Sequence, residues 1–185
     1  MTFQHLWGLL TSRRVGNVAV ILFLLSSVYL FGYRQMRFFR IPSSSMEPAL
    51  QRADQIVTLA YGEYRRGDIV VSRDPAEPGA YMVKRIVGVA GDLVSVVQGG
   101  LFLNGEYASE PYIVEPMLYG FVNPVLIPEG SVFLLGDNRN NSSDSHDNLE
   151  AFPVSDIIGR ALYVYFPYER WGAIRSYPLT NVQGH

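Results

Sequence analysis

The chain has 185 residues, enough for one membrane segment and one compact domain with its own core. Its formal net charge of −2 argues against nucleic acid as the main partner, because nucleic-acid-binding proteins gather positive charge. The absence of cysteine excludes disulfides and thiolate chemistry, and the three histidines argue against a histidine metal cluster, so we expect neither a metal nor a cofactor.

The first element in chain order is an apolar segment, residues 15–33, which contains no charged side chain. Helical residues rise about 1.5 Å each, so this segment would span roughly 28 Å, close to the hydrocarbon thickness of a bilayer. The sequence therefore predicts a transmembrane anchor after a short tail at residues 1–14. The alternative is a cleaved signal peptide, but the bulky residues that follow, LFGYRQMRFF, offer no small-x-small cleavage site. Arginines flank both ends in nearly equal number, so charge does not decide the orientation.

Residues 34–185 predict a compact, mainly β, antiparallel domain. Short runs rich in β-branched and aromatic residues alternate here with glycine, proline, asparagine and aspartate. The predicted strands are residues 37–41, 55–60, 68–72, 82–89, 93–97, 101–103, 132–135 and 157–166. Gly99-Gly100 and Asn104-Gly105 predict tight hairpin turns. Residues 46–51 are expected to form at most one helical turn, and residues 136–153 are too polar for the core.

A lysine and a group of serines are the candidate chemical groups. Ser43, Ser44 and Ser45 lie between two prolines and by themselves predict only a turn. In the predicted strand, alternate residues share a face, so Lys84 lies with the apolar Met82 and Ile86 while Arg85 points the other way.

Lys84 is the only lysine beside fourteen arginines. Arginine keeps its proton at any accessible pH, whereas a desolvated lysine can lose it. Lowering the pKa of a lysine from about 10.4 to near neutrality takes about 4 kcal/mol, which burial can supply. Lys84 is thus suited to act as a general base, and a buried lysine paired with a carboxylate is the alternative.

Residues 136–146, GDNRNNSSDSH, form a third segment of interest. In isolation this segment predicts a polar loop or a calcium loop. Its acidic residues lack the regular alternation and the terminal glutamate of an EF-hand.

Taken together and in this order, the apolar segment and the motifs SSSMEP, YMVKRIVG and GDNRNNSSDSH resemble type I signal peptidases over residues 15 to about 167. The resemblance implies that Ser45 is the nucleophile and Lys84 its general base. Ser43, with the Ser45 backbone N–H, would form the oxyanion hole, and Ser142 would orient Lys84. The residues implied to brace the lysine strand against the loop are Arg85, Asp137, Arg139 and Asp144. The residues implied to contact the substrate are Ile41, Pro42, Met46, Met82 and Val83.

Two positions depart from the common family pattern. Asn140 stands where an aspartate is frequent, and His146 stands where an arginine is frequent. The asparagine and the histidine resemble the residues found at these positions in the cyanobacterial and chloroplast thylakoid branch of the family. A neutral His146 would give Asp144 a hydrogen bond in place of a constant ion pair.

The resemblance also implies partners and a location. The substrates would be preprotein signal peptides with small residues at the first and third positions before the cut. The N-terminus would lie in the cytoplasm or stroma. The β domain would lie on the opposite side of the plasma or thylakoid membrane, in the periplasm or lumen. Phe38, Phe39 and Met46 are expected to be exposed and to rest in the lipid surface.

Two alternative functions remain open at this point. A self-cleaving repressor of the serine–lysine type would need a DNA-binding segment, where this chain has an apolar one. A catalytically silent, membrane-bound scaffold protein could have lost Ser45 or Lys84, and both are present.

Overall fold

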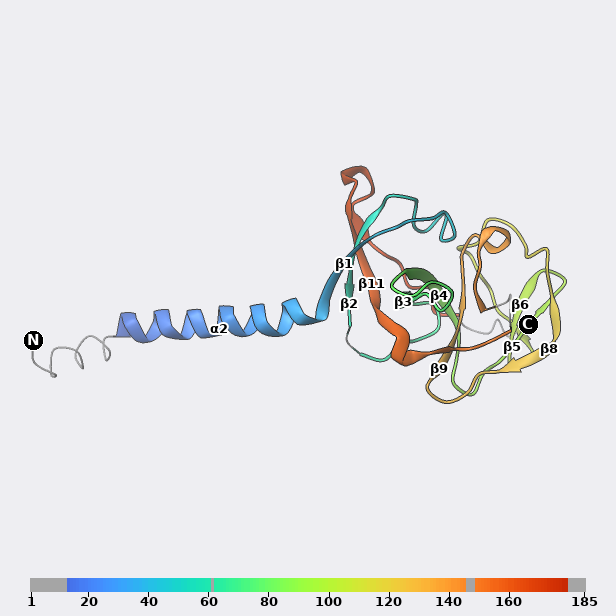
Figure 1. The fold of residues 1–185 in the computed structure, drawn as a ribbon, viewed down its shortest axis with the longest axis horizontal. Helices are drawn as coiled ribbons and strands as arrows, with labels where there is room; N and C mark the ends of the chain where they lie inside the picture. The colour runs from blue at the N-terminus through green and yellow to red at the C-terminus, as the bar shows by residue number, and fades with distance from the viewer. Residues whose placement is uncertain (1–12, 61, 146–148, 180–185) are drawn as a thin grey trace, which may run out of the picture. The chain divides into compact units, whose positions relative to one another are not determined.

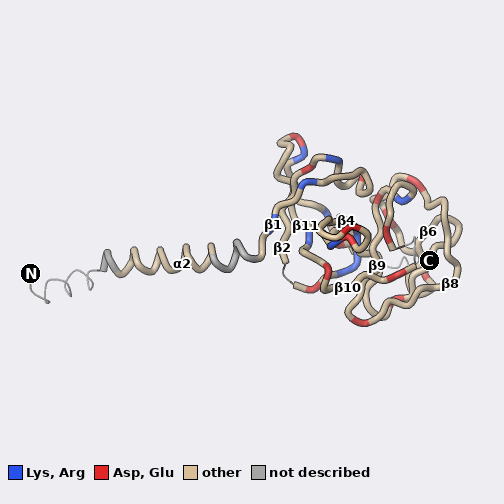
Figure 2. The backbone as a smooth tube through the Cα atoms, viewed as in Figure 1, with Lys and Arg blue, Asp and Glu red and all other residues tan. Residues whose placement is uncertain are grey.

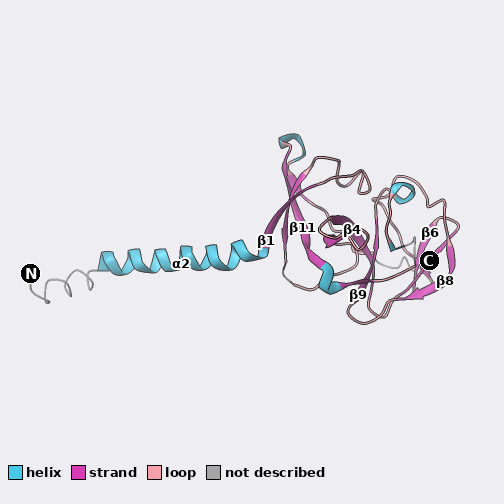
Figure 3. Ribbon diagram, in the orientation of Figure 1, coloured by secondary structure: helices cyan, strands magenta, loops and turns pink. Residues whose placement is uncertain are grey.

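The computed structural model describes residues 13–60, 62–145 and 149–179. The chain divides into two compact units, residues 1–36 and residues 37–185. Within the described residues, the first unit contains one helix, and the second contains β-strands joined by turns and three short 3₁₀ helices (Figures 1 and 3).

The helix of the first unit, α2 (Arg13–Gln35), covers the predicted apolar segment. Figure 2 shows no acidic or basic residue along its described middle part. Among the described residues, no helix is long and apolar enough to cross a membrane. A helix is therefore present where one was expected, and the transmembrane anchor at residues 15–33 stays a prediction.

The second unit contains a larger sheet with the strand order β1-β2-β11-β3-β4-β9-β10, and β12 pairs with β11. Its strands are β1 (Met36–Arg40), β2 (Gln55–Leu59), β3 (Ile69–Arg73), β4 (Tyr81–Val89), β9 (Ser131–Leu135), β10 (Phe152–Pro153), β11 (Ile157–Phe166) and β12 (Gly172–Ala173). The pairs from β2 through β11, β3, β4 and β9 to β10 are antiparallel. The mainly β, antiparallel prediction for this unit is confirmed.

A smaller antiparallel sheet has the order β7-β6-β5-β8. Its strands are β5 (Leu93–Val97), β6 (Gly100–Leu103), β7 (Glu106–Tyr107) and β8 (Phe121–Leu126). The predicted Asn104-Gly105 turn is confirmed, since both residues have positive φ and join β6 to β7. The other hairpin turn falls one residue earlier than predicted, at Gln98-Gly99, because Val97 pairs with Gly100.

The eight predicted strands are present with ends shifted by at most one residue, and four observed strands were not predicted: β7, β8, β10 and β12. The 3₁₀ helices are η1 (Arg139–Asn141), η2 (Val154–Asp156) and η3 (Tyr168–Arg170). The segment after the serines forms turns only, with the Leu50 N–H donating to the Met46 carbonyl oxygen at 2.9 Å.

The expectation that Met46 is exposed to lipid is wrong. Its side chain is 0% exposed and belongs to a core cluster with Ile41, Leu50 and Ile56. The chain folds back here, because the Ile41 N–H donates to the Asp54 carbonyl oxygen at 2.8 Å. Phe38 is 58% exposed, as expected, whereas Phe39 is half-buried against that same cluster.

Candidate functional site

Strand β4 leaves part of one edge unpaired. Strand β3 pairs with Tyr81–Arg85 along one edge, and β9 pairs with the other edge only from Arg85 to Val89. Strand β9 ends at Leu135, and the chain then turns toward the serines, where the Asn138 N–H donates to the Ser45 carbonyl oxygen at 3.0 Å. No strand in the described part of the chain covers this edge of residues 81–84, so the edge can accept an extended peptide.

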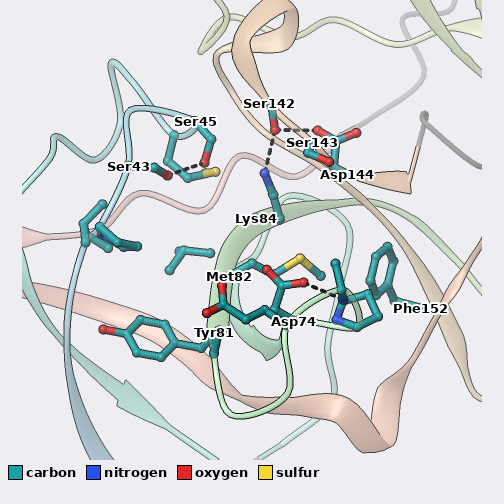
Figure 4. A pocket seen from close by; sticks show the side chains of 18 of the residues that line it. Ser43, Ser45, Asp74, Tyr81, Met82, Lys84, Ser142, Ser143, Asp144 and Phe152 are labelled. Atoms are coloured by element: carbon teal, nitrogen blue, oxygen red, sulfur yellow. Dashed lines mark hydrogen bonds between the residues drawn. The ribbon is translucent and has the colours of Figure 1, made fainter.

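Lys84 lies in this half of β4 and is buried, with 4% of its surface exposed. Its strand face is apolar as predicted: Val70 is its partner on β3, and Val70, Met82 and Ile86 contribute to one hydrophobic cluster. The Lys84 Nζ donates a hydrogen bond to Ser142 Oγ at 2.6 Å, and Ser142 Oγ donates in turn to Asp144 Oδ2 at 2.6 Å (Figure 4). The tip of the lysine is thus held by the loop after β9.

The serine turn presents its hydroxyls to the same space. Ser45 is 9% exposed, and its Oγ lies 3.2 Å from Ser43 Oγ (Figure 4). The neighbouring Ser44 is tied to the loop instead, since Asn141 Nδ2 donates to Ser44 Oγ at 3.2 Å. The three consecutive serines therefore have different surroundings, and Ser43 and Ser45 form a pair.

Gly136 allows the serine turn and the loop to approach closely. A Cβ at this position would lie 2.5 Å from the Ser45 carbonyl oxygen and closer still to Ser142 Oγ. Real Cβ atoms do not approach backbone oxygen so closely, so a side chain here would push apart the turn and the loop. The Gly136 N–H donates to Asp144 Oδ2 at 2.8 Å. This hydrogen bond fixes the carboxylate that accepts the hydrogen bond from Ser142.

Arg85 connects the lysine strand to this loop through a buried ion pair. Its Nε and Nη2 donate to the two carboxylate oxygens of Asp137 at 2.8 and 2.7 Å, and both side chains are fully buried. Burial raises the pKa of the Asp137 carboxyl, and the hydrogen bonds from Arg85 act against this. The structure therefore brings Arg85 and Asp137 together as supports between strand and loop.

Arg139, predicted to brace the lysine strand, has a different partner. It forms a two-point ion pair with Glu110, with Nη1 donating to Oε2 at 2.7 Å, and its Nε donates to the Gly136 carbonyl oxygen at 2.9 Å. Glu110 is 8% exposed and also accepts a hydrogen bond from the Tyr112 hydroxyl at 2.6 Å. Burial, and then the charge of Glu110, raise the pKa of Tyr112. Arg139 thus braces the loop against the segment that follows β7.

An open cleft of about 750 Å³ brings the predicted catalytic and substrate-contact residues together (Figure 4). Each of them lines it: Ile41, Pro42, Ser43, Ser45, Met46, Met82, Val83, Lys84 and Ser142. Asp144 also lines the cleft, whereas Arg85, Asp137 and Arg139 do not line it and form buried ion pairs. His146 lies outside the described residues. In the described ranges, no three histidine, cysteine or acidic side chains are grouped so as to hold a metal ion.

The chain is similar to known proteins over most of its length. Residues 13–166 match the family model described as "Signal peptidase, peptidase S26". A "Probable signal peptidase I-1" of Synechocystis is 38% identical, over 74% of this chain and 74% of its own length. "Signal peptidase I" of Bacillus licheniformis is 35% identical, over 82% of this chain and 85% of its own length. "Thylakoidal processing peptidase 1, chloroplastic" of Arabidopsis thaliana is 38% identical, over 69% of this chain and 41% of its own length.

Proposed function

Because the chain belongs to the signal peptidase family, peptidase S26, and has signal peptidase I and thylakoidal processing peptidase relatives, we propose that it removes signal peptides from exported preproteins. In this proposal Ser45 is the nucleophile and Lys84 is its general base. The observation that carries it is the buried Lys84 amine, held by Ser142 in the cleft that also contains the Ser43–Ser45 hydroxyl pair.

The chemistry is acyl transfer. A neutral Lys84 takes the proton of the Ser45 hydroxyl as the Ser45 oxygen attacks the scissile carbonyl. The Ser43 hydroxyl and the Ser45 backbone N–H stabilise the tetrahedral oxyanion, and one such donor is typically worth about 3 kcal/mol. The protonated lysine then gives its proton to the leaving amine. The neutral lysine next takes a proton from a water that attacks the Ser45 ester, and the ester bond breaks as Ser45 regains its proton and the new carboxyl end leaves. Ser142, fixed by Asp144, keeps the amine pointed into the cleft throughout.

The substrate binds as an added strand. The uncovered edge of residues 81–84 offers backbone hydrogen bonds to an extended peptide, and Pro42 and Ser43 line the facing wall of the cleft. Ile41, Met46 and Val83 also line the cleft and are nearly fully buried, so the wall that they offer to substrate side chains is apolar. In this proposal the residues at the first and third positions before the cut are small ones such as alanine.

We also propose that residues 15–33 anchor the chain in the plasma or thylakoid membrane, with the N-terminus in the cytoplasm or stroma. The support is that this segment has no charge and that its described side chains between Val18 and Tyr29 are almost all exposed, with apolar ones on every side of α2.

Cleavage of one preprotein by serine variants tests the proposed nucleophile. Ser45→Ala should abolish cleavage, and Ser43→Ala should slow it by about 100- to 1,000-fold because it removes one oxyanion donor. Ser44→Ala is the matched control, since Ser44 Oγ contacts Asn141 and not the Ser43–Ser45 pair. Its cleavage rate should stay within a few-fold of the wild type. Normal cleavage by Ser45→Ala would refute the assignment.

A further inference from the structure

The wall of the cleft beyond Met82 is acidic. The hairpin loop between β3 and β4, residues 74–80, contributes Asp74 and Glu77 to the cleft lining (Figure 4 labels Asp74). The other charged residues that line the cleft are Lys84 and Asp144, and Asp144 already accepts hydrogen bonds from Gly136 and Ser142. The carboxylates therefore outnumber the amines at the end of the cleft away from Ser45.

Neither acidic side chain of this loop is neutralised within the described part of the chain. Asp74 Oδ1 accepts a hydrogen bond from the Ala76 N–H at 2.8 Å, which leaves its charge in place, and no described residue forms an ion pair with Asp74 or Glu77. The adjacent Arg73 instead pairs with Asp156, at 3.2 Å. Glu77 is exposed and Asp74 is half-buried, so both carboxylates are available to a bound peptide.

The path of the substrate decides which of its residues meets these carboxylates. The proposed function places an extended peptide along the edge of residues 81–84 and its scissile carbonyl beside Ser45. Here the residues before the cut are taken to lie along Met82–Lys84. An extended peptide advances about 3.3 Å per residue, so the fourth to sixth residues before the cut pass Ala80 and the acidic loop. Arg40 and Arg52 line a neighbouring cavity, which shares Tyr81 with the cleft, and neither arginine is part of the cleft lining.

We propose that Asp74 and Glu77 form a specificity-determining acidic subsite that selects preproteins with a basic residue, and rejects those with an acidic residue, at the fourth to sixth positions before the cut. The inference rests on the proposed function, because it uses the same cleft and the same strand edge for the peptide. Two unit charges about 6 Å apart in water change a rate by about three-fold. Exchanging lysine for glutamate turns attraction into repulsion at both carboxylates, which amounts to four such factors, or about 100-fold without salt. At 0.15 M salt a screening length of about 8 Å roughly halves each energy, so we expect kcat/KM to change by about ten-fold.

The test is a competition between two peptides cleaved by the full-length chain in detergent. Both peptides span one signal peptide cleavage site with alanine at the first and third positions, and they differ only in lysine or glutamate at the fifth position before the cut. Wild type should cleave the lysine peptide about ten-fold faster. Asp74→Asn with Glu77→Gln should bring the ratio of the two kcat/KM values to within about two-fold of unity, and Glu77→Lys should move it in the same direction. Raising the salt from 0.15 M to 1 M should reduce the wild-type ratio, because it shortens the screening length from about 8 Å to about 3 Å.

Two single substitutions outside the cleft lining serve as controls for the acidic subsite. Glu106→Gln removes an exposed carboxylate on the smaller sheet, outside the cleft, and should leave the ratio unchanged. Arg40→Gln should also leave it unchanged if the cleft lining determines selectivity. A lysine preference that survives the double substitution, or one that Arg40→Gln shifts as strongly, would overturn the acidic subsite while cleavage itself continues. If wild type cleaves neither peptide, both the inference and the proposed function are wrong.

Discussion

Lys84 is positioned by its strand and held at its tip by a hydrogen bond. Its strand face was predictable, because a two-residue period places it with Met82 and Ile86, and the structure confirms an apolar face with Val70 opposite. The roles of Ser43, Ser45, Lys84 and Ser142 stay predictions, although all four line one cleft. Glu110 was missed because its partner Arg139 is 29 residues away, and only the folded chain brings these charges together.

Replacing Lys84 by methionine separates a catalytic amine from a structural ion pair. If the folded chain holds the amine neutral, folding at pH 7 must release the proton that the unfolded lysine carries. This cost disappears only above the unfolded pKa of about 10.4, so it destabilises the wild type at neutral pH. Lys84→Met keeps the packing and removes that cost, so it should be inactive yet at least as stable as the wild type. Thermal melts at pH 7 measure this, and a melting temperature well below that of the wild type would show a charged structural lysine.

Strands in which apolar and polar residues alternate regularly were predictable from the sequence, whereas short or interrupted strands were not. Strand β8 contains Pro124 and lies at the edge of the smaller sheet, where proline is tolerated but weakens the sequence signal. Strands β7, β10 and β12 have two residues each, too few for any period to show. Their pairing depends on the neighbouring strand in space, which local sequence does not encode.

The buried carboxylate of Asp92 connects a segment of the larger sheet with a hairpin of the smaller sheet. Asp92, in the turn between β4 and β5, accepts hydrogen bonds from Arg66 Nε at 2.7 Å, from the Val89 N–H at 2.9 Å and from Asn104 Nδ2 at 3.2 Å. Burial by itself would raise the pKa of Asp92, but these hydrogen bonds, that from Arg66 first, hold it below its usual value. Asp92 therefore links the approach to β3, through Arg66, with the hairpin of the smaller sheet, through Asn104.

The Asp92 network should make stability depend on pH with a definite sign. A carboxylate whose folded pKa is lowered stabilises the fold above its unfolded pKa of about 3.9, and this stabilisation is lost as the pH falls through the folded pKa. Asp92→Asn should lower the free energy of unfolding by about 1–3 kcal/mol at pH 7, and the difference should shrink below about pH 4. Urea unfolding at both pH values measures it.

The matched control for Asp92 is Asp156→Asn, which breaks an exposed pair with Arg73. Exposed pairs contribute at most about 1 kcal/mol, so this variant should differ little from the wild type at either pH. If the free energies of unfolding of Asp92→Asn and wild type differ by the same amount from pH 7 to pH 3, the charge of Asp92 does not stabilise the fold.

At the scale of the whole molecule, the division of the chain after residue 36 separates an apolar helix from the unit that contains every site residue. If residues 15–33 are a membrane anchor, a charge in their middle should be costly, by about 2.5–3.5 kcal/mol for arginine at the bilayer centre. Leu24→Arg should therefore reduce the fraction of full-length chain that is retained in membranes after carbonate extraction. Leu24→Ile is the control, and equal retention of both variants would contradict the anchor.

In the proposed mechanism, peptide cleavage by the unit that contains both sheets depends on the ability of Lys84 to lose a proton. The most direct measurement is cleavage of one preprotein by the Lys84→Arg chain beside the wild type. Arginine preserves the positive charge and a hydrogen-bond donor toward Ser142 but stays protonated at any accessible pH. We predict no detectable cleavage by a variant that still melts cooperatively. Cleavage at the wild-type rate would show that Lys84 is not the base.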